Sequence, residues 1–129
     1  ADVVHDLDAF PYPFADASFD QILMQDVIEH VAEPLRVIAE LARISRPGAR
    51  IQLRTPHFSS VLAYGDPTHR HVFSTLAVRQ LATPRFEHYS ATHPQRANLD
   101  DGVALRGESG GLEVEYNVIH PASLALWVG

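Results

Sequence analysis

The feature that most constrains the fold is a strand, helix and strand pattern between residues 19 and 56. Residues 19–24 form a short apolar run behind a turn-rich segment, which is typical of a buried strand. Apolar residues then recur at helical spacing over residues 33–46, and residues 50–55 alternate between apolar and polar side chains. This order predicts two parallel strands joined by a crossover helix, and therefore an α/β fold.

Signals at the ends of the expected helix support its boundaries. Pro34 suits the first turn of a helix, where a missing amide hydrogen costs nothing. Arg43 and Arg46 lie where the helix dipole favours positive charge, and Pro47-Gly48 is a stop signal.

The remainder of the chain divides into a loop, a short helix and a hairpin. Residues 57–73 form a long irregular segment after the second strand, and such segments usually carry function. Ser74 can cap a helix that runs to about Ala82. Residues 112–118 alternate cleanly and predict a half-exposed antiparallel strand, paired with residues 103–105 through a glycine-rich turn at residues 107–111.

Composition limits the class of protein. With 129 residues, 46% of them hydrophobic, the chain can form one domain with a real core. A net charge of -6 without any run of like charges disfavours a nucleic-acid partner. The absence of cysteine and of any apolar stretch near 20 residues predicts a cytoplasmic protein without a membrane anchor.

Six short motifs occur together in the first part of the chain. They are His5-Asp6-Leu7, Pro11-Tyr12-Pro13-Phe14, Ser18-Phe19-Asp20, Glu29-His30-Val31, Arg46-Pro47-Gly48 and Thr55-Pro56-His57. In this order and spacing they resemble the type-11 family of class I S-adenosylmethionine-dependent methyltransferases. The resemblance covers about the first 75 residues.

The resemblance implies a Rossmann-like methyltransferase fold, of which this chain would be the C-terminal portion. We expect one partial domain over residues 1–129, with a cofactor-side core (1–56), an acceptor-side loop (57–74) and a helix with antiparallel strands (75–129). The family's first strands and glycine-rich cofactor loop do not occur in the chain, because the glycines of residues 107–111 fall in a hairpin turn. The chain is therefore expected to be either N-terminally truncated or a degenerate relative.

The resemblance also implies which residues bind S-adenosylmethionine. Asp6 would follow a strand and accept a hydrogen bond from the adenine amino group, and the Leu7 backbone would meet the ring. Gln25 and Asp26 would line the methionine and sulfonium part, where a carboxylate suits a cation. His30 would border this site, with a positioning role ahead of a catalytic one. The alternatives are that Asp6 caps a turn and that Asp26 caps a helix.

The histidine-rich loop predicts an acceptor site. Because it follows the carboxyl end of a strand, it should form one wall of the pocket. If the acceptor is a hydroxyl, a histidine oriented by a carboxylate can take its proton, so His57, His69 and Asp66 are the candidate catalytic residues. A loop held together by histidine hydrogen bonds is the structural alternative.

The same loop admits a metal interpretation. His57, Asp66, His69 and His71 offer imidazole and carboxylate ligands that zinc or non-haem iron accepts. Closely spaced histidines in a loop are nevertheless common without a metal, and we predict no metal site from the sequence.

Three functions follow from these observations. The leading hypothesis is an S-adenosylmethionine-dependent methyltransferase acting on a small-molecule or glycan-like acceptor. The second is a noncatalytic interaction module that pairs an open sheet edge with a partner or forms a homodimer. The third is a metal-dependent hydrolase built on the histidine loop.

Overall fold

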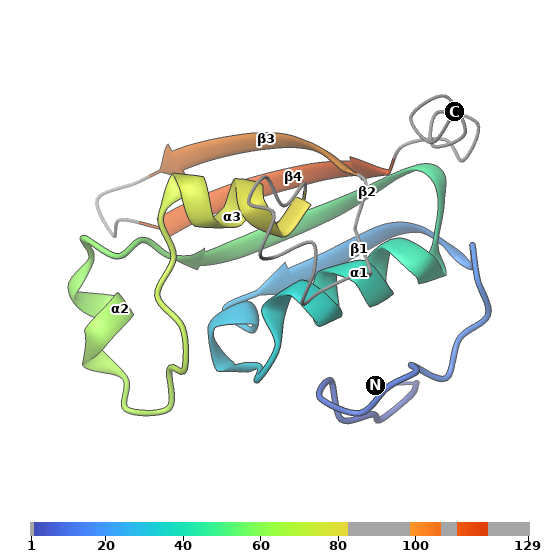
Figure 1. Cartoon of the computed structure of the whole chain (residues 1–129), viewed down its shortest axis with the longest axis horizontal. Helices are drawn as coiled ribbons and strands as arrows, with labels where there is room; N and C mark the ends of the chain where they lie inside the picture. Colours follow the sequence, from blue (N-terminus) through green and yellow to red (C-terminus); the bar gives the residue numbers. More distant parts are fainter. Residues whose placement is uncertain (1, 83–98, 107–110, 119–129) are drawn as a thin grey trace.

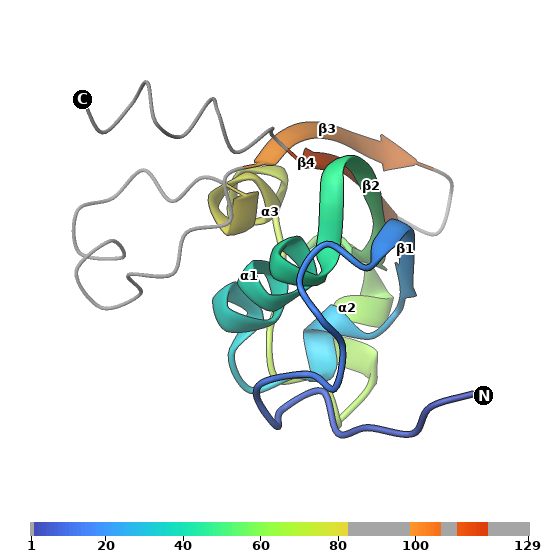
Figure 2. The same cartoon turned by 90° about the vertical axis from the view of Figure 1, so that its right-hand side faces the viewer.

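A computed structural model describes residues 2–82, 99–106 and 111–118. Its elements are β1 (Phe19–Gln25), the 3-10 turn η1 (Ile28–His30), α1 (Pro34–Ile44), β2 (Ser45–Pro56), α2 (Val61–Gly65), α3 (Thr75–Ala82), β3 (Leu99–Arg106) and β4 (Gly111–Val118). The strands form one sheet in the order β1-β2-β4-β3, and α1 and α3 cover the same face of it (Figures 1 and 2). No helix in the described ranges is long and apolar enough to cross a membrane.

The predicted crossover unit is confirmed. β1 and β2 pair in parallel, with Ile22 opposite Ile51 and Met24 opposite Leu53, and α1 lies between them in the chain. Because both strands run in the same direction, their carboxyl ends lie at one edge of the sheet, where η1 and α2 also lie (Figure 1).

The helix ends earlier and the second strand begins earlier than predicted. α1 stops at Ile44, and the Ser45 hydroxyl donates to the Leu41 carbonyl at 2.7 Å. β2 already starts at Ser45, which pairs with Phe19 across a bulge, and passes through Gly48 at a positive φ of 83°. Pairing with β1 therefore decides this boundary, rather than the Pro-Gly signal.

The core lies between the sheet and its two helices. Val37 and Ile38 of α1 are fully buried, as are Ile51 of β2 and Tyr116 of β4. The Tyr116 hydroxyl donates to the carbonyl of Val78 in α3 at 2.5 Å, which ties the second helix to the sheet. The alternating apolar positions of β2 and β4 thus face the helices, as their period of two requires.

The predicted antiparallel hairpin is confirmed in its described part. β3 and β4 pair with Val103 opposite Val114, and β4 pairs in turn with β2. β3 begins at Leu99, several residues before the predicted start, and so includes Asp100-Asp101-Gly102. The glycine-rich turn, residues 107–110, lies outside the described residues.

The N-terminal segment follows a different course from the strand expected before Asp6. Residues 2–6 are not in a strand, and Val3 and Val4 are 50% and 93% exposed. A strand needs a paired neighbour, and among the described residues β1 pairs with β2 and with no other strand. The segment is instead fixed further along, where Tyr12 is buried and its amide donates to the Glu40 carboxylate.

Candidate functional site

The carboxyl end of β1 carries two of the predicted cofactor residues. Gln25 ends the strand and Asp26 follows it, and both side chains are exposed. Asp26 has a positive φ of 53°, which is uncommon for a residue with a side chain, and its amide donates to the Arg54 carbonyl at 2.8 Å. Strained backbone of this kind concentrates at functional sites, and here it occurs at a residue whose carboxylate is exposed at the carboxyl end of β1.

Asp6 and Leu7 lie in the N-terminal loop. Asp6 Oδ1 accepts the amide of Asp8 at 2.9 Å, which is the turn-capping role given above as its alternative. Asp8 in turn accepts the amide of Ala32 at 3.0 Å, so this loop is docked beside the residues that follow η1. The Leu7 carbonyl accepts the Tyr12 hydroxyl at 2.9 Å. The exposed Asp6 carboxylate therefore combines a local capping contact with access to solvent.

The histidine loop and η1 meet in one cluster. Glu29, His30 and His69 each present a ligand-type atom, and these atoms all lie within 4.8 Å of one another. Glu29 Oε1 is 3.9 Å from the Nε2 atoms of both His30 and His69. Asp66 approaches from the outside, with Oδ2 at 3.6 Å from His69 Nε2.

Glu29 is the least expected member of this cluster. Its side chain is 2% exposed, and its Oε2 accepts the hydroxyl of the fully buried Thr55 at 3.0 Å. Its backbone carbonyl accepts the amides of Arg70 and His71, at 2.8 and 3.2 Å, which fastens the histidine loop to η1. We assigned no site role to Glu29 from the sequence; a carboxylate placed between the apolar residues Val27-Ile28 and Val31 was the available signal.

Asp66 is held by a local turn. The amide and hydroxyl of Thr68 donate to Asp66 Oδ1 at 2.8 and 2.6 Å. These hydrogen bonds lower the pKa of Asp66, and the one from the Thr68 hydroxyl has the largest effect. Asp66 therefore remains ionised and keeps its second oxygen directed at His69.

The other two loop histidines, His57 and His71, contact residues outside this cluster. His57 Nδ1 pairs with the Ser59 hydroxyl at 2.6 Å and accepts the Ser59 amide at 3.2 Å. His71 Nε2 lies 3.2 Å from the Ala32 carbonyl. The structure thus brings together His69 and Asp66 from the predicted catalytic set, adds His30 from the predicted cofactor set, and gives His57 a different partner.

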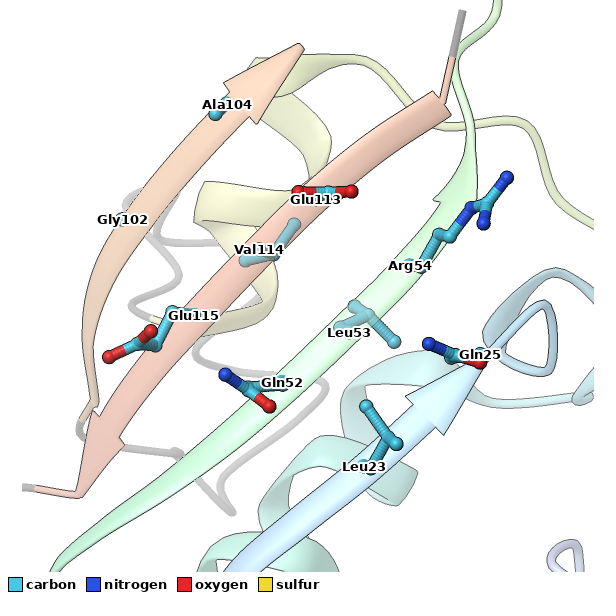
Figure 3. Close-up of a pocket in the computed structure, with 10 residues that line it drawn as sticks. All are labelled: Leu23, Gln25, Gln52, Leu53, Arg54, Gly102, Ala104, Glu113, Val114 and Glu115. Atoms are coloured by element: carbon cyan, nitrogen blue, oxygen red, sulfur yellow. The ribbon is translucent and has the colours of Figure 1, made fainter. Parts of the chain in front are cut away.

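Two hollows flank these residues. One lies on the sheet face opposite the helices and is lined by Leu23, Gln25, Gln52, Leu53, Arg54, Gly102, Ala104, Glu113, Val114 and Glu115 (Figure 3). Gln25 and Arg54 stand at its end nearest the carboxyl ends of the strands (Figure 3). The other hollow lies between the start of α1 and α3 and includes His71. Of the predicted site residues, Gln25 borders a hollow directly.

Comparison with known proteins gives consistent matches. Residues 2–53 match the family described as methyltransferase domain. The demethylmenaquinone methyltransferase of Mycobacterium sp. (strain KMS) is 34% identical over 116 residues, which is 81% of this chain and 46% of that protein. The demethylmenaquinone methyltransferase of Renibacterium salmoninarum is 30% identical over 126 residues, 92% of this chain and 52% of that protein.

The fold has solved counterparts. A crystal structure of a SAM-dependent methyltransferase from Archaeoglobus fulgidus superposes with a TM-score of 0.66 at 11% identity, covering 89% of this chain and 66% of that one. At this identity the likeness concerns the fold. The chain spans about half the length of the curated relatives it matches.

Proposed function

Residues 2–53 belong to the methyltransferase domain family and the sheet has the fold of S-adenosylmethionine-dependent methyltransferases, and from this premise we propose that the full-length protein methylates an apolar small molecule. The observation that carries the proposal is a convergence at one sheet edge. The Gln25-Asp26 corner and the histidine loop both follow carboxyl ends of parallel strands, which is where ligands bind in open α/β sheets.

The residues present suit S-adenosylmethionine. This cofactor supplies a methyl group on a cationic sulfur, and the exposed Asp26 carboxylate offers the opposite charge beside it. Asp6 offers an exposed carboxylate to an exocyclic amine. Gln25 offers a side-chain amide at the end of the hollow on the sheet face opposite the helices. His30 borders the same corner through η1.

Exposed side chains of the acceptor-side loop favour an apolar acceptor over a glycan-like one. Val61 and Tyr64 of α2 are 85% and 72% exposed, and Phe58 and Leu62 are about half exposed. Contiguous exposed apolar groups usually mark a binding surface. The relatives named demethylmenaquinone methyltransferase support this class of acceptor.

If the acceptor is a hydroxyl, we assign the removal of its proton to the histidines. His69 lies between the carboxylates of Asp66 and Glu29, which would stabilise its imidazolium form after it takes a proton. His57, paired with Ser59, is the second candidate. For other acceptors, alignment of the nucleophile behind the methyl carbon is the main contribution of the site.

Calorimetry with the full-length gene product tests the cofactor site. We expect S-adenosylmethionine to bind the wild type, and Asp26→Asn to weaken binding by at least about tenfold, the effect of losing one charged contact. Asp20→Asn is the matched control, because Asp20 lies at the opposite end of β1 in an exposed pair with Arg46. Absence of binding to the wild type would overturn the proposal, and equal effects of the two variants would overturn the assignment of Asp26.

A transfer assay tests the acceptor. Full-length protein is incubated with cofactor labelled on the methyl group and with either demethylmenaquinone or a neutral oligosaccharide. We expect label in the quinone and none in the sugar. Label in the sugar alone would contradict the apolar acceptor while leaving the methyltransferase activity in place.

A further inference from the structure

We infer that Glu29, His30 and His69 form a binding site for a divalent transition metal of the zinc class, with Asp66 as an outer ligand. The site groups His30 from the predicted cofactor set and His69 and Asp66 from the predicted catalytic set around Glu29, and metal binding there does not depend on methyl transfer. Its ligand atoms come from two segments 39 residues apart that the fold brings within 4.8 Å.

The first argument is an unpaired buried oxygen. Glu29 Oε1 is buried and has no hydrogen-bond partner among the described residues, although Oε2 of the same carboxylate is paired with Thr55. Leaving a buried charged acceptor without a partner is costly, so such an oxygen calls for a ligand. It points at the gap between the two imidazoles, 3.9 Å from each Nε2 atom.

The second argument concerns the protons of the two histidines. His69 Nδ1 lies 3.1 Å from the Ala63 carbonyl, which can only accept, so the ring proton is on Nδ1. His30 Nδ1 lies 3.3 Å from the Thr68 carbonyl and 3.2 Å from the Thr68 hydroxyl. That hydroxyl already donates to Asp66, so His30 Nδ1 must also carry the proton.

In the neutral imidazoles both Nε2 atoms then present lone pairs toward Glu29 Oε1. Three acceptors that face one another repel unless a cation stands between them. A histidine that binds a metal through one ring nitrogen usually donates a hydrogen bond from the other nitrogen to a carbonyl or carboxylate group. This hydrogen bond fixes the tautomer and the orientation of the ring. A single proton could satisfy only part of this arrangement, because it would pair two of the three acceptors.

The donor set indicates the class of metal. Two imidazoles and a carboxylate, with a second carboxylate nearby, suit zinc and the neighbouring first-row ions better than calcium or magnesium. Ligand atoms about 2.0–2.2 Å from a tetrahedral zinc lie roughly 3.4 Å apart. The distances of 3.9 Å from Glu29 Oε1 to each Nε2 and of 3.6 Å from Asp66 Oδ2 to His69 Nε2 need a small contraction, and the two imidazoles, whose ligand atoms lie within 4.8 Å of each other, would close around the ion.

This assignment differs from the metal interpretation of the sequence. That interpretation used His57, Asp66, His69 and His71, whereas His57 and His71 have other partners in the structure. It also competes with His69 as a proton acceptor, because a nitrogen bound to metal has no free lone pair.

Metal binding is tested on the full-length protein after treatment with a chelator. We expect calorimetric titration with zinc chloride to give one site per chain, and cobalt(II) to give the visible absorption of a tetrahedral complex. His30→Gln and His69→Gln should each weaken zinc binding by at least about tenfold, because losing only the outer hydrogen-bond partner of a ligand already costs about 10–100-fold. His71→Gln is the matched control, since it removes an imidazole from the same loop but outside the cluster.

Thermal unfolding of each variant in chelator separates loss of binding from loss of folding. At one fixed zinc concentration the midpoint should rise for the wild type and for His71→Gln, and should rise less for His30→Gln and His69→Gln. Failure of the wild type to bind zinc or cobalt(II), or equal weakening by His71→Gln, would overturn the proposal. Either result leaves cofactor binding, measured separately, unaffected.

Discussion

At the scale of single residues, the molecule is organised around a buried carboxylate. One carboxylate oxygen of Glu29 accepts the Thr55 hydroxyl, and the other faces two histidines. The backbone carbonyl of Glu29 accepts two amides of the histidine loop and so holds this loop in place. A buried charge persists only when such contacts compensate its lost hydration. The geometry of the candidate site therefore depends on Glu29 even where other residues meet the ligand.

Replacing Thr55 with valine tests this dependence. The change keeps the side-chain shape but removes the donor to Glu29 Oε2, so we expect the free energy of unfolding to fall by about 1–3 kcal/mol. Urea unfolding measures it. Thr55→Ser retains the hydroxyl and should lose less; a valine variant as stable as the wild type would show that the hydrogen bond contributes nothing net.

At the scale of secondary-structure elements, α1 anchors the N-terminal segment as well as joining the two parallel strands. Glu40 accepts the Tyr12 amide, and Arg43 donates both to Glu40 and to Asp16. The hydrogen bond from Arg43 is the main reason that the pKa of Glu40 lies below its ordinary value of 4.5. This network fixes the loop that carries Asp6 and Leu7.

The Glu40 network predicts a dependence of stability on pH. A carboxylate whose pKa is lower in the folded protein stabilises it above its unfolded pKa, and this contribution is lost as pH falls through the folded value. We expect Glu40→Gln to be less stable than the wild type at pH 7, by roughly 1.5–3 kcal/mol for a hydrogen bond to a charged group. Below pH 4.5 the two proteins should converge.

Denaturant unfolding between pH 7 and pH 3 measures this convergence. Glu33→Gln is the control, because Glu33 lies just before the same helix in an exposed pair with Arg36 and should change little. A constant difference between wild type and Glu40→Gln across this range would contradict the role given to ionised Glu40.

The cap of α3 gives a second prediction for an element. The Ser74 hydroxyl accepts the Ala77 amide at 3.1 Å, as expected from the sequence. Ser74→Ala should therefore destabilise the protein by about 1 kcal/mol in urea unfolding, whereas Ser74→Asp, which can still cap the helix, should stay near the wild type. Equal losses in both variants would indicate that Ser74 acts through packing instead.

At the scale of the whole molecule, helices cover one face of the sheet and, among the described residues, none covers the other (Figure 2). The open face carries Gln25, Gln52, Arg54, Glu113 and Glu115, with the exposed Leu23 beside them on β1 (Figure 3). Because β2 and β4 each have paired neighbours on both sides, they are the central strands of the described sheet. The candidate site lies at the carboxyl ends of β1 and β2, which are an edge strand and a central strand of the described sheet.

Hydrogen exchange tests this arrangement. Amides bonded within a central strand open only with the sheet, whereas half of those in a strand with one neighbour point away from it. Peptides from β2 should exchange more slowly than peptides from β3, which pairs with β4 alone among the described strands. Mass spectrometry at neutral pH measures both; equal protection would mean that β3 has a second partner.

The sequence by itself determined the local elements and the family. The period of two in β2 and β4, the helical period of α1 and the Ser74 cap are properties of neighbouring residues, so they can be read along the chain. The six spaced motifs likewise indicated a methyltransferase fold, which the matches to relatives and solved structures support.

Only the tertiary structure decided which residues meet. The start of β2 at Ser45 follows from pairing with Phe19, and the partnership of Glu29 with Thr55 and His69 joins three separate segments. Sequence spacing grouped His69 with His57 and His71, whereas the fold grouped it with His30. Local patterns record burial and turns, but contacts between distant segments depend on how the elements pack together, which no local period encodes.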